Sequence, residues 1–343
     1  MVRIGVMTGG GDCPGLNAVI RAVTKTATRS FGDEVVGFME GWQGVIERNF
    51  IDLTNYDTSG LIDQGGTILG TSRSSPGLYD GGLEKAKNSI EEMGLHALVV
   101  IGGDGTLRAA HELETLGGNV VGIPKTIDND IAGTEYTFGF NTAVQIATDL
   151  IDRLRTTAES HNRVMVVEVM GRHVGHVATH AGIAGGAEVI LIPEQPFDIE
   201  EVCERLRRRH ATGRYSSIIV AAEGALPREG SVEFGEPERD MWGNVKIGGI
   251  GDLIGKSVEQ HTGFESRVTV LGHVQRGGTP TAYDRVLCTR YGVAAVEAIH
   301  DREFGTMVAL TGDTIARVRL NEVIDHEKPV SQRLYDVASH FFA

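Results

Sequence analysis

The feature that most constrains the fold of this 343-residue chain is a repeated pattern in which a short apolar run ends near glycine and a helical segment follows. Residues 3–8 run into Gly9-Gly10-Gly11, and residues 97–101 run into Gly102-Gly103. Strands and helices that alternate in this way are typical of α/β proteins. The same pattern predicts strands at 164–169, 189–192, 217–222 and 267–271, and helices at 16–30, 106–116, 142–157 and 199–211.

Length and charge narrow the class of protein further. At 343 residues the chain exceeds the usual size of a single hydrophobic core, so two domains are expected. A formal net charge of −14 argues against nucleic acid or an anionic membrane as the main partner. The chain enters a strand pattern at once and holds no apolar run of membrane-spanning length, so we expect no signal peptide and a cytoplasmic location. The polar stretch 226–246 predicts an exposed insertion.

Cysteine and histidine patterns do not favour a structural metal. Cys13, Cys203 and Cys288 are odd in number and lack CxxC spacing, which favours reduced thiols. His173, His176 and His180 have the spacing of one helix face, but no carboxylate or thiol accompanies them at ligand spacing. We therefore do not expect a metal at these histidines.

The two commonest phosphate-binding loops are both incomplete in this chain. A dinucleotide fingerprint that starts at Gly9 would need glycine at position 14, which is Pro14. A Walker A loop that ends in Gly255-Lys256-Ser257 would need glycine at position 250, which is Ile250. Neither a Rossmann dehydrogenase nor a P-loop kinase is supported.

A different glycine loop lies between a predicted strand and a predicted helix, at Gly102-Gly103-Asp104-Gly105-Thr106. Glycine permits positive φ and close backbone approach, the helix start offers N–H groups to an anion, and Asp104 can hold a cation. This arrangement suits a nucleotide with Mg²⁺. The alternative is a tight strand-to-helix turn with an aspartate as the N-cap.

Two carboxylates follow the apolar run 120–123, in the segment from Pro124 to Asp130. If the segment is extended, Asp128 and Asp130 point to the same side and suit a shared ligand or Mg²⁺. The alternative is a solvated turn, since proline, aspartate and asparagine all favour turns.

Taken together, these motifs resemble the 6-phosphofructokinase family, and they are most similar to its actinobacterial, ATP-dependent branch. Six segments carry the resemblance in family order: 8–17, 65–73, 102–106, 124–130, 168–172 and 271–278. The resemblance implies two Rossmann-like three-layer α/β domains with the active site in the cleft between them. It implies a larger nucleotide-binding domain of residues 1–139 plus about 254–306, and a smaller sugar-phosphate-binding domain of about 140–253 plus 307–343.

The implied reaction is phosphorylation of D-fructose 6-phosphate at its 1-hydroxyl by ATP, which gives fructose 1,6-bisphosphate and ADP in the committed step of glycolysis. Asp128 matches the catalytic base, while Arg172 and Thr126 match residues that stabilise the transferring phosphoryl group. Asp104 matches the Mg²⁺ aspartate, with Asp130 a weaker candidate. The matching nucleotide contacts are Gly11, Arg73, Ser74, Gly103, Asp104, Gly105 and Thr106.

Sugar-phosphate recognition is implied by a second group of residues. Arginine suits a phosphate dianion because its guanidinium binds oxygens in pairs. The matching sugar-phosphate and sugar contacts are Thr126, Ile127, Asp128, Arg163, Met170, Gly171, Arg172, Glu223, Arg267, His273 and Arg276. In the family Arg163 and Arg267 enter from a neighbouring subunit, so the resemblance implies a homotetramer with shared active sites.

Gly105 and Lys125 stand at the two positions that distinguish the phosphoryl donors in the family, and they indicate different donors. ATP-dependent members typically carry glycine at both matching positions, whereas pyrophosphate-dependent members carry aspartate and lysine. An aspartate at 105 would crowd and repel the inner phosphates of a nucleotide, so Gly105 favours ATP. Lys125 leaves a pyrophosphate-dependent enzyme as the alternative.

Other functions remain open alternatives. A lipid or NAD kinase also uses a Gly-Gly-Asp-Gly loop but would not need the arginine set, and a non-catalytic sugar-phosphate sensor would be expected to lack Asp128. Arg21 and Arg155 match effector-site arginines of the family, whereas Lys25 and Thr212 replace arginine and lysine of its bacterial members. Allosteric control by ADP or phosphoenolpyruvate is therefore only a hypothesis.

Overall fold

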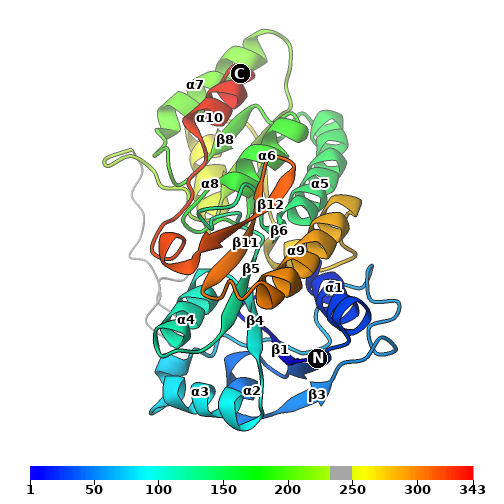
Figure 1. Cartoon of the computed structure of the whole chain (residues 1–343). Coiled ribbons are helices and arrows are strands. Elements are labelled where there is room, and N and C mark those ends of the chain that lie inside the picture. Colours follow the sequence, from blue (N-terminus) through cyan, green and yellow to red (C-terminus); the bar gives the residue numbers. More distant parts are fainter. Residues whose placement is uncertain (232–248, 343) are drawn as a thin grey trace. The chain divides into compact units, whose positions relative to one another are not determined.

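The computed structural model of the chain describes residues 1–231 and 249–342 and has the predicted α/β architecture (Figure 1). The chain forms two compact units. Unit 1 comprises Met1–Thr142 and Arg276–Glu327, and unit 2 comprises Ala143–Gln275 and Lys328–Ala343. Each unit is therefore discontinuous in sequence.

Unit 1 is built on a sheet whose strand order is β12-β11-β5-β4-β1-β2-β3, with β6 paired to β5. The β2–β3 and β11–β12 pairs are antiparallel, and the other pairs are parallel. The strands are β1 (Arg3–Thr8), β2 (Glu34–Phe38), β3 (Phe50–Asp52), β4 (Ala97–Gly102), β5 (Val120–Thr126), β6 (Phe138–Gly139), β11 (Thr306–Thr311) and β12 (Thr314–Arg319). Because β5, β4 and β1 are parallel neighbours, their carboxyl ends meet at one edge of the sheet.

Helices cover both faces of this sheet. On one face lie α2 (Trp42–Glu47), α3 (Gly82–Glu92) and α4 (Asp104–Thr115), and on the other lie α1 (Leu16–Thr26) and α9 (Ala282–His300) (Figure 1). The helix predicted at 16–30 continues past α1 as one π-helical segment, Ala27–Phe31. Short 3₁₀ turns occur at Pro76–Leu78 and Leu320–Glu322.

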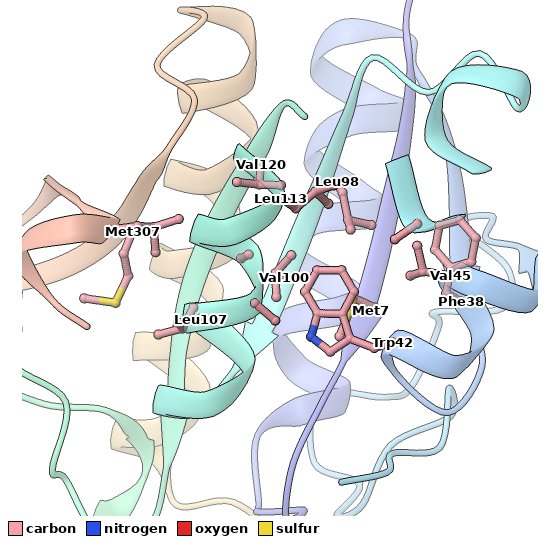
Figure 2. Packing of buried hydrophobic residues seen from close by; sticks show 14 of the residues in the cluster. Met7, Phe38, Trp42, Val45, Leu98, Val100, Leu107, Leu113, Val120 and Met307 are labelled. Carbon is pink, nitrogen blue, oxygen red and sulfur yellow. The ribbon is translucent and has the colours of Figure 1, made fainter. Parts of the chain in front are cut away.

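The core of unit 1 forms where α2 and α4 pack on the sheet (Figure 2). Leu107 and Leu113 of α4 contact a sheet surface that includes Val100 and Val120, and Trp42 of α2 lies beside Met7. All six of these apolar side chains are almost completely removed from water, and such burial stabilises the fold by about 1.5–3 kcal/mol per large apolar side chain. This packing holds the start of α4 against the end of β4.

Unit 2 is built on a smaller, parallel sheet in the order β10-β7-β9-β8. Its strands are β7 (Val164–Val169), β8 (Val189–Leu191), β9 (Ser217–Ala222) and β10 (Ser266–Val270). Its helices are α5 (Phe140–His161), which begins in unit 1, and α6 (His176–Ala184), α7 (Ile199–Ala211), α8 (Ile250–Thr262) and α10 (Gln332–Ser339), with a 3₁₀ turn at Gly272–Arg276. Side chains of α7 and α8 pack against one face of this sheet.

The unit boundaries differ from the expected 1–139 plus 254–306. The second segment of unit 1 starts at Arg276, because α8 and β10 join the β7 sheet of unit 2. It extends to Glu327 because β11 pairs with β5 and β12 pairs with β11. Gly255-Lys256-Ser257 lies within α8, which agrees with the absence of a phosphate loop there.

The structure also bears on the predicted exposed insertion at 226–246 and on the predicted reduced cysteines. Of the predicted insertion, residues 226–231 are described and mostly exposed, whereas 232–246 lie outside the described residues. Cys13, Cys203 and Cys288 are buried free thiols. In the part of the chain that the structure describes, no helix is long and apolar enough to cross a membrane.

Candidate functional site

A pocket of about 440 Å³ opens in unit 1 where β1, β4 and β5 end. In open α/β sheets, ligands bind at the carboxyl ends of the strands. The pocket is lined by Gly10, Gly11, Asp12, Ser72, Arg73, Ser74, Ser75, Gly103, Asp104, Gly105, Thr106, Arg108, Lys125, Thr126, Ile127, Asp128 and Arg276. It brings together the candidate catalytic and nucleotide-binding residues of unit 1, whereas the weaker Mg²⁺ candidate Asp130 is not among its lining residues.

The glycine loop forms the turn from β4 into α4. Gly103 is the N-cap of α4 and Asp104 is its first residue, so the N-cap aspartate alternative is wrong. The expected positive φ is also absent, since Gly102, Gly103 and Gly105 are not among the positive-φ glycines. Close approach explains Gly102 instead, because a Cβ there would lie 2.4 Å from the Cβ of Thr106. The free N–H groups at the start of α4 suit an anion.

Asp104 is held by a cation that the sequence reasoning missed. Arg108, one helical turn further along α4, lies 3.0 Å from the Asp104 carboxylate and is also paired with Asp325. These two carboxylates outweigh desolvation and raise the pKa of Arg108. The i,i+4 spacing of Asp104 and Arg108 on a predicted helix was the signal for this pair.

The segment after β5 is a turn, and the interpretation as an extended strand is wrong. β5 ends at Thr126, and Asn129 has a left-handed φ of 54°, so Asp128 and Asp130 do not alternate as in a strand. The Thr126 hydroxyl accepts a hydrogen bond from the Asp128 N–H at 3.1 Å. Asn129 is only 3% exposed, so the turn is buried at its centre and is not a solvated one.

Asp130 is a partly buried carboxylate at the end of this segment. Burial raises its pKa, and nearby Asp104 and Glu327 add to that effect, while its own backbone N–H and the Thr126 hydroxyl oppose it. Asp130 does not line the pocket, whereas Asp128 does. The two aspartates therefore have different environments.

Lys125 lies beneath the first glycine loop. Its ammonium group donates a hydrogen bond to the carbonyl of Gly11, and the residue as a whole is 3% exposed. Burial lowers the pKa of Lys125, and the Arg276 guanidinium lowers it further. A Cβ at Gly11 would lie 1.6 Å from an Arg276 nitrogen, so a side chain at this position would displace the Arg276 guanidinium.

Arg73 and Ser74 lie on a segment that is bound to the first glycine loop. The Gly10 N–H donates to the carbonyl of Ser72 at 2.9 Å, and the Thr71 hydroxyl donates to the carbonyl of Gly10 at 2.6 Å. These bonds hold Arg73 and Ser74 on the pocket wall.

In unit 2, a second group of candidate residues gathers where β7, β9 and β10 end. The Glu223 N–H donates to the carbonyl of Val169, and the Gly224 N–H donates to the carbonyl of Gly171. The Leu271 N–H donates to the carbonyl of Glu168, which joins the segment before His273 to the end of β7. The candidate residues at these carboxyl ends are Met170, Gly171, Arg172, Glu223 and His273.

Arg163 and Arg267 lie at the other end of the same strands. Arg163 immediately precedes β7, and Arg267 is the second residue of β10. Both are paired with the carboxylate of Glu265, which lies 2.9 Å from Arg163. Because β7 has six residues, roughly 20 Å separates its two ends. The structure thus joins Arg163 to Arg267 but separates them from Met170, Gly171 and Glu223.

Comparison with known proteins identifies the family. The family model described as phosphofructokinase matches residues 3–299 of the chain. The chain belongs to the phosphofructokinase family. It is therefore a phosphotransferase, as its sequence motifs predicted.

Relatives within the phosphofructokinase family carry two different donor names. A pyrophosphate–fructose 6-phosphate 1-phosphotransferase of Amycolatopsis methanolica is 54% identical, and the match covers 99% of this chain and 100% of the relative. An ATP-dependent 6-phosphofructokinase of Corynebacterium efficiens is 51% identical, with 99% of each chain covered. Overall similarity therefore does not distinguish the two donors.

Solved structures agree on the phosphofructokinase fold. The phosphofructokinase of Saccharomyces cerevisiae matches with a TM-score of 0.82 and 33% identity, over 99% of this chain and 47% of the yeast chain. This chain thus spans about half the length of that protein. A pyrophosphate-dependent phosphofructokinase from Marinobacter aquaeolei, at 22% identity, matches with a TM-score of 0.83 over 100% of this chain and 92% of the other and shows the same fold.

The histidine group of this phosphofructokinase makes backbone contacts. His176 binds the carbonyl of Lys328 through Nε2 at 2.9 Å, and His180 binds the carbonyl of His176 through Nδ1 at 2.8 Å. Since carbonyls only accept, both ring nitrogens act as donors. Within residues 1–231 and 249–342, no group of three or more histidines, cysteines or carboxylates is arranged to hold a metal ion.

The four effector-site positions are divided between the two units. Arg21 and Lys25 belong to α1 of unit 1, whereas Arg155 and Thr212 belong to unit 2. Arg155 donates to the carbonyl of Gly186 at 2.7 Å. The proposed allosteric control stays a hypothesis.

Proposed function

We propose that this phosphofructokinase transfers the terminal phosphoryl group of ATP to the 1-hydroxyl of fructose 6-phosphate. The products are fructose 1,6-bisphosphate and ADP. The pocket of unit 1 is the proposed nucleotide site, and the carboxyl ends of β7, β9 and β10 in unit 2 carry the proposed sugar contacts.

The observation that favours ATP as the phosphoryl donor is the open space at Gly105. A Cβ there would have no heavy atom within 4 Å, although the residue lies on the pocket wall at the start of α4. An uncharged, open position leaves room for the inner phosphates of a nucleotide, whereas a carboxylate would repel them. Gly105 therefore supports a nucleotide donor.

Pyrophosphate is the second candidate donor because of Lys125. Its ammonium group lies at the edge of the pocket, where it would attract a small polyanion. However, Lys125 is buried and already donates to the carbonyl of Gly11, and burial lowers its pKa. These constraints make Lys125 compatible with either donor, so Gly105 decides our preference for ATP.

In the proposed reaction, Asp128 is the general base that accepts the proton of the sugar 1-hydroxyl. Its carboxylate accepts the proton of the sugar 1-hydroxyl while that oxygen forms a bond to the terminal phosphorus, and the bond from that phosphorus to the bridging oxygen of ADP breaks. Thr126, which also lines the pocket, and Arg172 stabilise the charge on the transferring group. The expected nucleotide-phosphate contacts are Gly11, Arg73, Ser74, Gly103, Asp104, Gly105 and Thr106.

The residues of the pocket fit a Mg²⁺ ion that is bound mainly by the donor. Asp104 offers one half-exposed carboxylate, and the described residues form no cage of three acidic or histidine ligands. Mg²⁺ commonly binds one or two carboxylates together with phosphate oxygens and water. Asp104 would hold the ion, which neutralises charge on the phosphates when bound.

Sugar-phosphate binding is proposed to need a second copy of the chain. Within one chain, Arg163 and Arg267 are separated by roughly the length of β7 from Met170, Gly171 and Glu223. This separation supports a site in which Arg163 and Arg267 come from a neighbour, while His273 and Arg276 come from the same chain as Glu223. A homotetramer with shared sites is the proposed assembly.

The test is turnover of fructose 6-phosphate with ATP and with pyrophosphate, measured side by side in coupled assays with Mg²⁺ present. We expect kcat/KM with ATP to exceed that with pyrophosphate by at least about tenfold. Equal or faster turnover with pyrophosphate would make this a pyrophosphate-dependent enzyme. No turnover with either donor would reject fructose 6-phosphate as the acceptor.

A further inference from the structure

The turn that contains Asp128 is hydrogen-bonded to a later segment of the chain, residues 134–139, which we call the returning segment. Residues 134–139 return to the end of β5 and finish in β6, which pairs with β5 in parallel, Lys125 with Phe138 and Thr126 with Gly139. Tyr136 and Tyr291 fasten the start of this segment, because the Tyr291 hydroxyl donates to the carbonyl of Tyr136 at 2.6 Å. The returning segment is thus a fixed surface on which the Asp128 turn rests.

Thr137 makes the central contact between the returning segment and the Asp128 turn. Its hydroxyl donates to the carbonyl of Thr126 at 2.7 Å, and Thr137 is 1% exposed. Thr126 in turn accepts the Asp128 N–H through its own hydroxyl at 3.1 Å. A chain of two hydrogen bonds therefore joins the buried hydroxyl of Thr137 to the backbone of Asp128.

Asn129 makes a second set of contacts with the same segment. Its side-chain oxygen accepts the Thr137 N–H at 3.0 Å and lies 3.4 Å from the Thr137 hydroxyl, and its amide nitrogen donates to the carbonyl of Glu135 at 3.3 Å. Asn129 also adopts the left-handed φ that reverses the chain after Asp128. Asparagine tolerates this conformation better than other non-glycine residues.

We propose that Thr137 is a positioning residue for phosphoryl transfer, acting with Asn129 to fix the backbone on both sides of Asp128. The inference rests on the proposed role of Asp128 as the base. Thr137 and Asn129 are buried and touch Thr126 and the backbone of the turn, so they act through Asp128 and not on the substrate. Proton abstraction depends on geometry at the scale of a single hydrogen bond, so small displacements of this carboxylate reduce the rate.

The matched pair Thr137→Val and Thr137→Ser isolates the hydroxyl. Valine keeps the branched shape and removes the donor to Thr126, whereas serine keeps the donor. We expect Thr137→Val to lower kcat by about 10- to 100-fold with KM for both substrates within about threefold of wild type. Thr137→Ser is expected to restore kcat to within about threefold of wild type.

A control separates positioning from general stability. Thr134 is a buried threonine on the same returning segment, but its hydroxyl contacts Tyr136 and Tyr291. Thr134→Val should lower the thermal midpoint and leave kcat per folded enzyme within about threefold of wild type. If Thr137→Val does not fold, Asn129→Gly takes its place, since glycine accepts the left-handed φ and removes only the side-chain bonds.

A double-mutant cycle with Asp128→Asn separates this inference from the proposed function. Asp128→Asn should reduce kcat by at least about 1,000-fold, and adding Thr137→Val should then change the residual rate by less than about threefold. Undiminished turnover in Asp128→Asn alone would reject Asp128 as the base. If Asp128→Asn is inactive but Thr137→Val has wild-type kcat, or costs the same factor in both backgrounds, the positioning role of Thr137 is rejected.

Discussion

At the residue scale, the glycines around the pocket have different physical roles. Gly11 makes room for the Arg276 guanidinium and Gly102 makes room for Thr106, so both serve contacts within the protein. Gly105 differs, because a Cβ at this position would meet open space. A small side chain at position 105 would therefore fit without disturbing the fold, and under the proposed function it would alter donor binding.

We expect Gly105→Asp to fold normally and to lower kcat/KM for ATP by about 10- to 100-fold, because a carboxylate repels the nucleotide phosphates. The measurement is steady-state turnover with ATP and with pyrophosphate. Gly105→Asn is the matched control, since it has the same size without the charge. An equal loss in both variants would show that crowding, and not repulsion, excludes ATP.

At the element scale, α6 is attached to the chain's C-terminal segment by a buried histidine. His176 is 6% exposed and donates to the carbonyl of Lys328. Burial lowers the pKa of His176 to about 4 from the usual 6.5. The nearby charges of Lys328 and His180 also lower this pKa, whereas the hydrogen bond to the Lys328 carbonyl raises it. Folding therefore keeps His176 neutral.

This buried histidine predicts a loss of stability in mild acid. Its contribution is fully present above pH 6.5 and is lost as the pH falls towards 4, because the unfolded chain then binds the proton and the folded chain does not. Between pH 7.5 and 5.0 the expected loss is about 2 kcal/mol, measured by urea unfolding.

His176→Gln keeps a hydrogen-bond donor and removes the titration, so its stability should fall less between the two pH values than that of wild type. The exposed His340→Gln is the control and should behave like wild type. Equal pH dependence in wild type and His176→Gln would show that other groups cause the loss.

At the scale of the whole molecule, the proposed sugar-phosphate contacts lie in two separate groups within each chain. Glu265 holds Arg163 and Arg267 together near the start of β7, while Glu223 and Met170 lie at the carboxyl ends of β9 and β7. Strands are stiff over this length, so no side chain of one group reaches the other along the sheet. Activity should therefore depend on assembly.

We expect size-exclusion chromatography with light scattering to give four times the 36.8 kDa chain mass. Specific activity should fall when the enzyme is diluted below its assembly constant, because each site needs arginines from a neighbour. Adding fructose 6-phosphate should protect against this loss, since it would bind across the interface. A fully active monomer would contradict the shared site.

Much of the fold and of the pocket was predictable from local sequence. The strands at 3–8, 164–169 and 217–222 and the helix at 199–211 have the predicted bounds, because each is a strongly apolar or amphipathic run with clear ends. The pocket residues were predictable because glycine loops follow strands, and parallel strands end at one edge. The role of each residue remains a proposal.

The rest depended on contacts between distant segments. The sequence by itself determined the α/β class, the strand ends that form the pocket and, through its motifs, the phosphofructokinase family. Only the tertiary structure decided that Arg108 also pairs with Asp325, that Lys125 is bound to Gly11, and that the Asp128 turn contacts Thr137. The physical reason is that local patterns specify elements, whereas burial and hydrogen-bond partners arise only when elements far apart in sequence pack together.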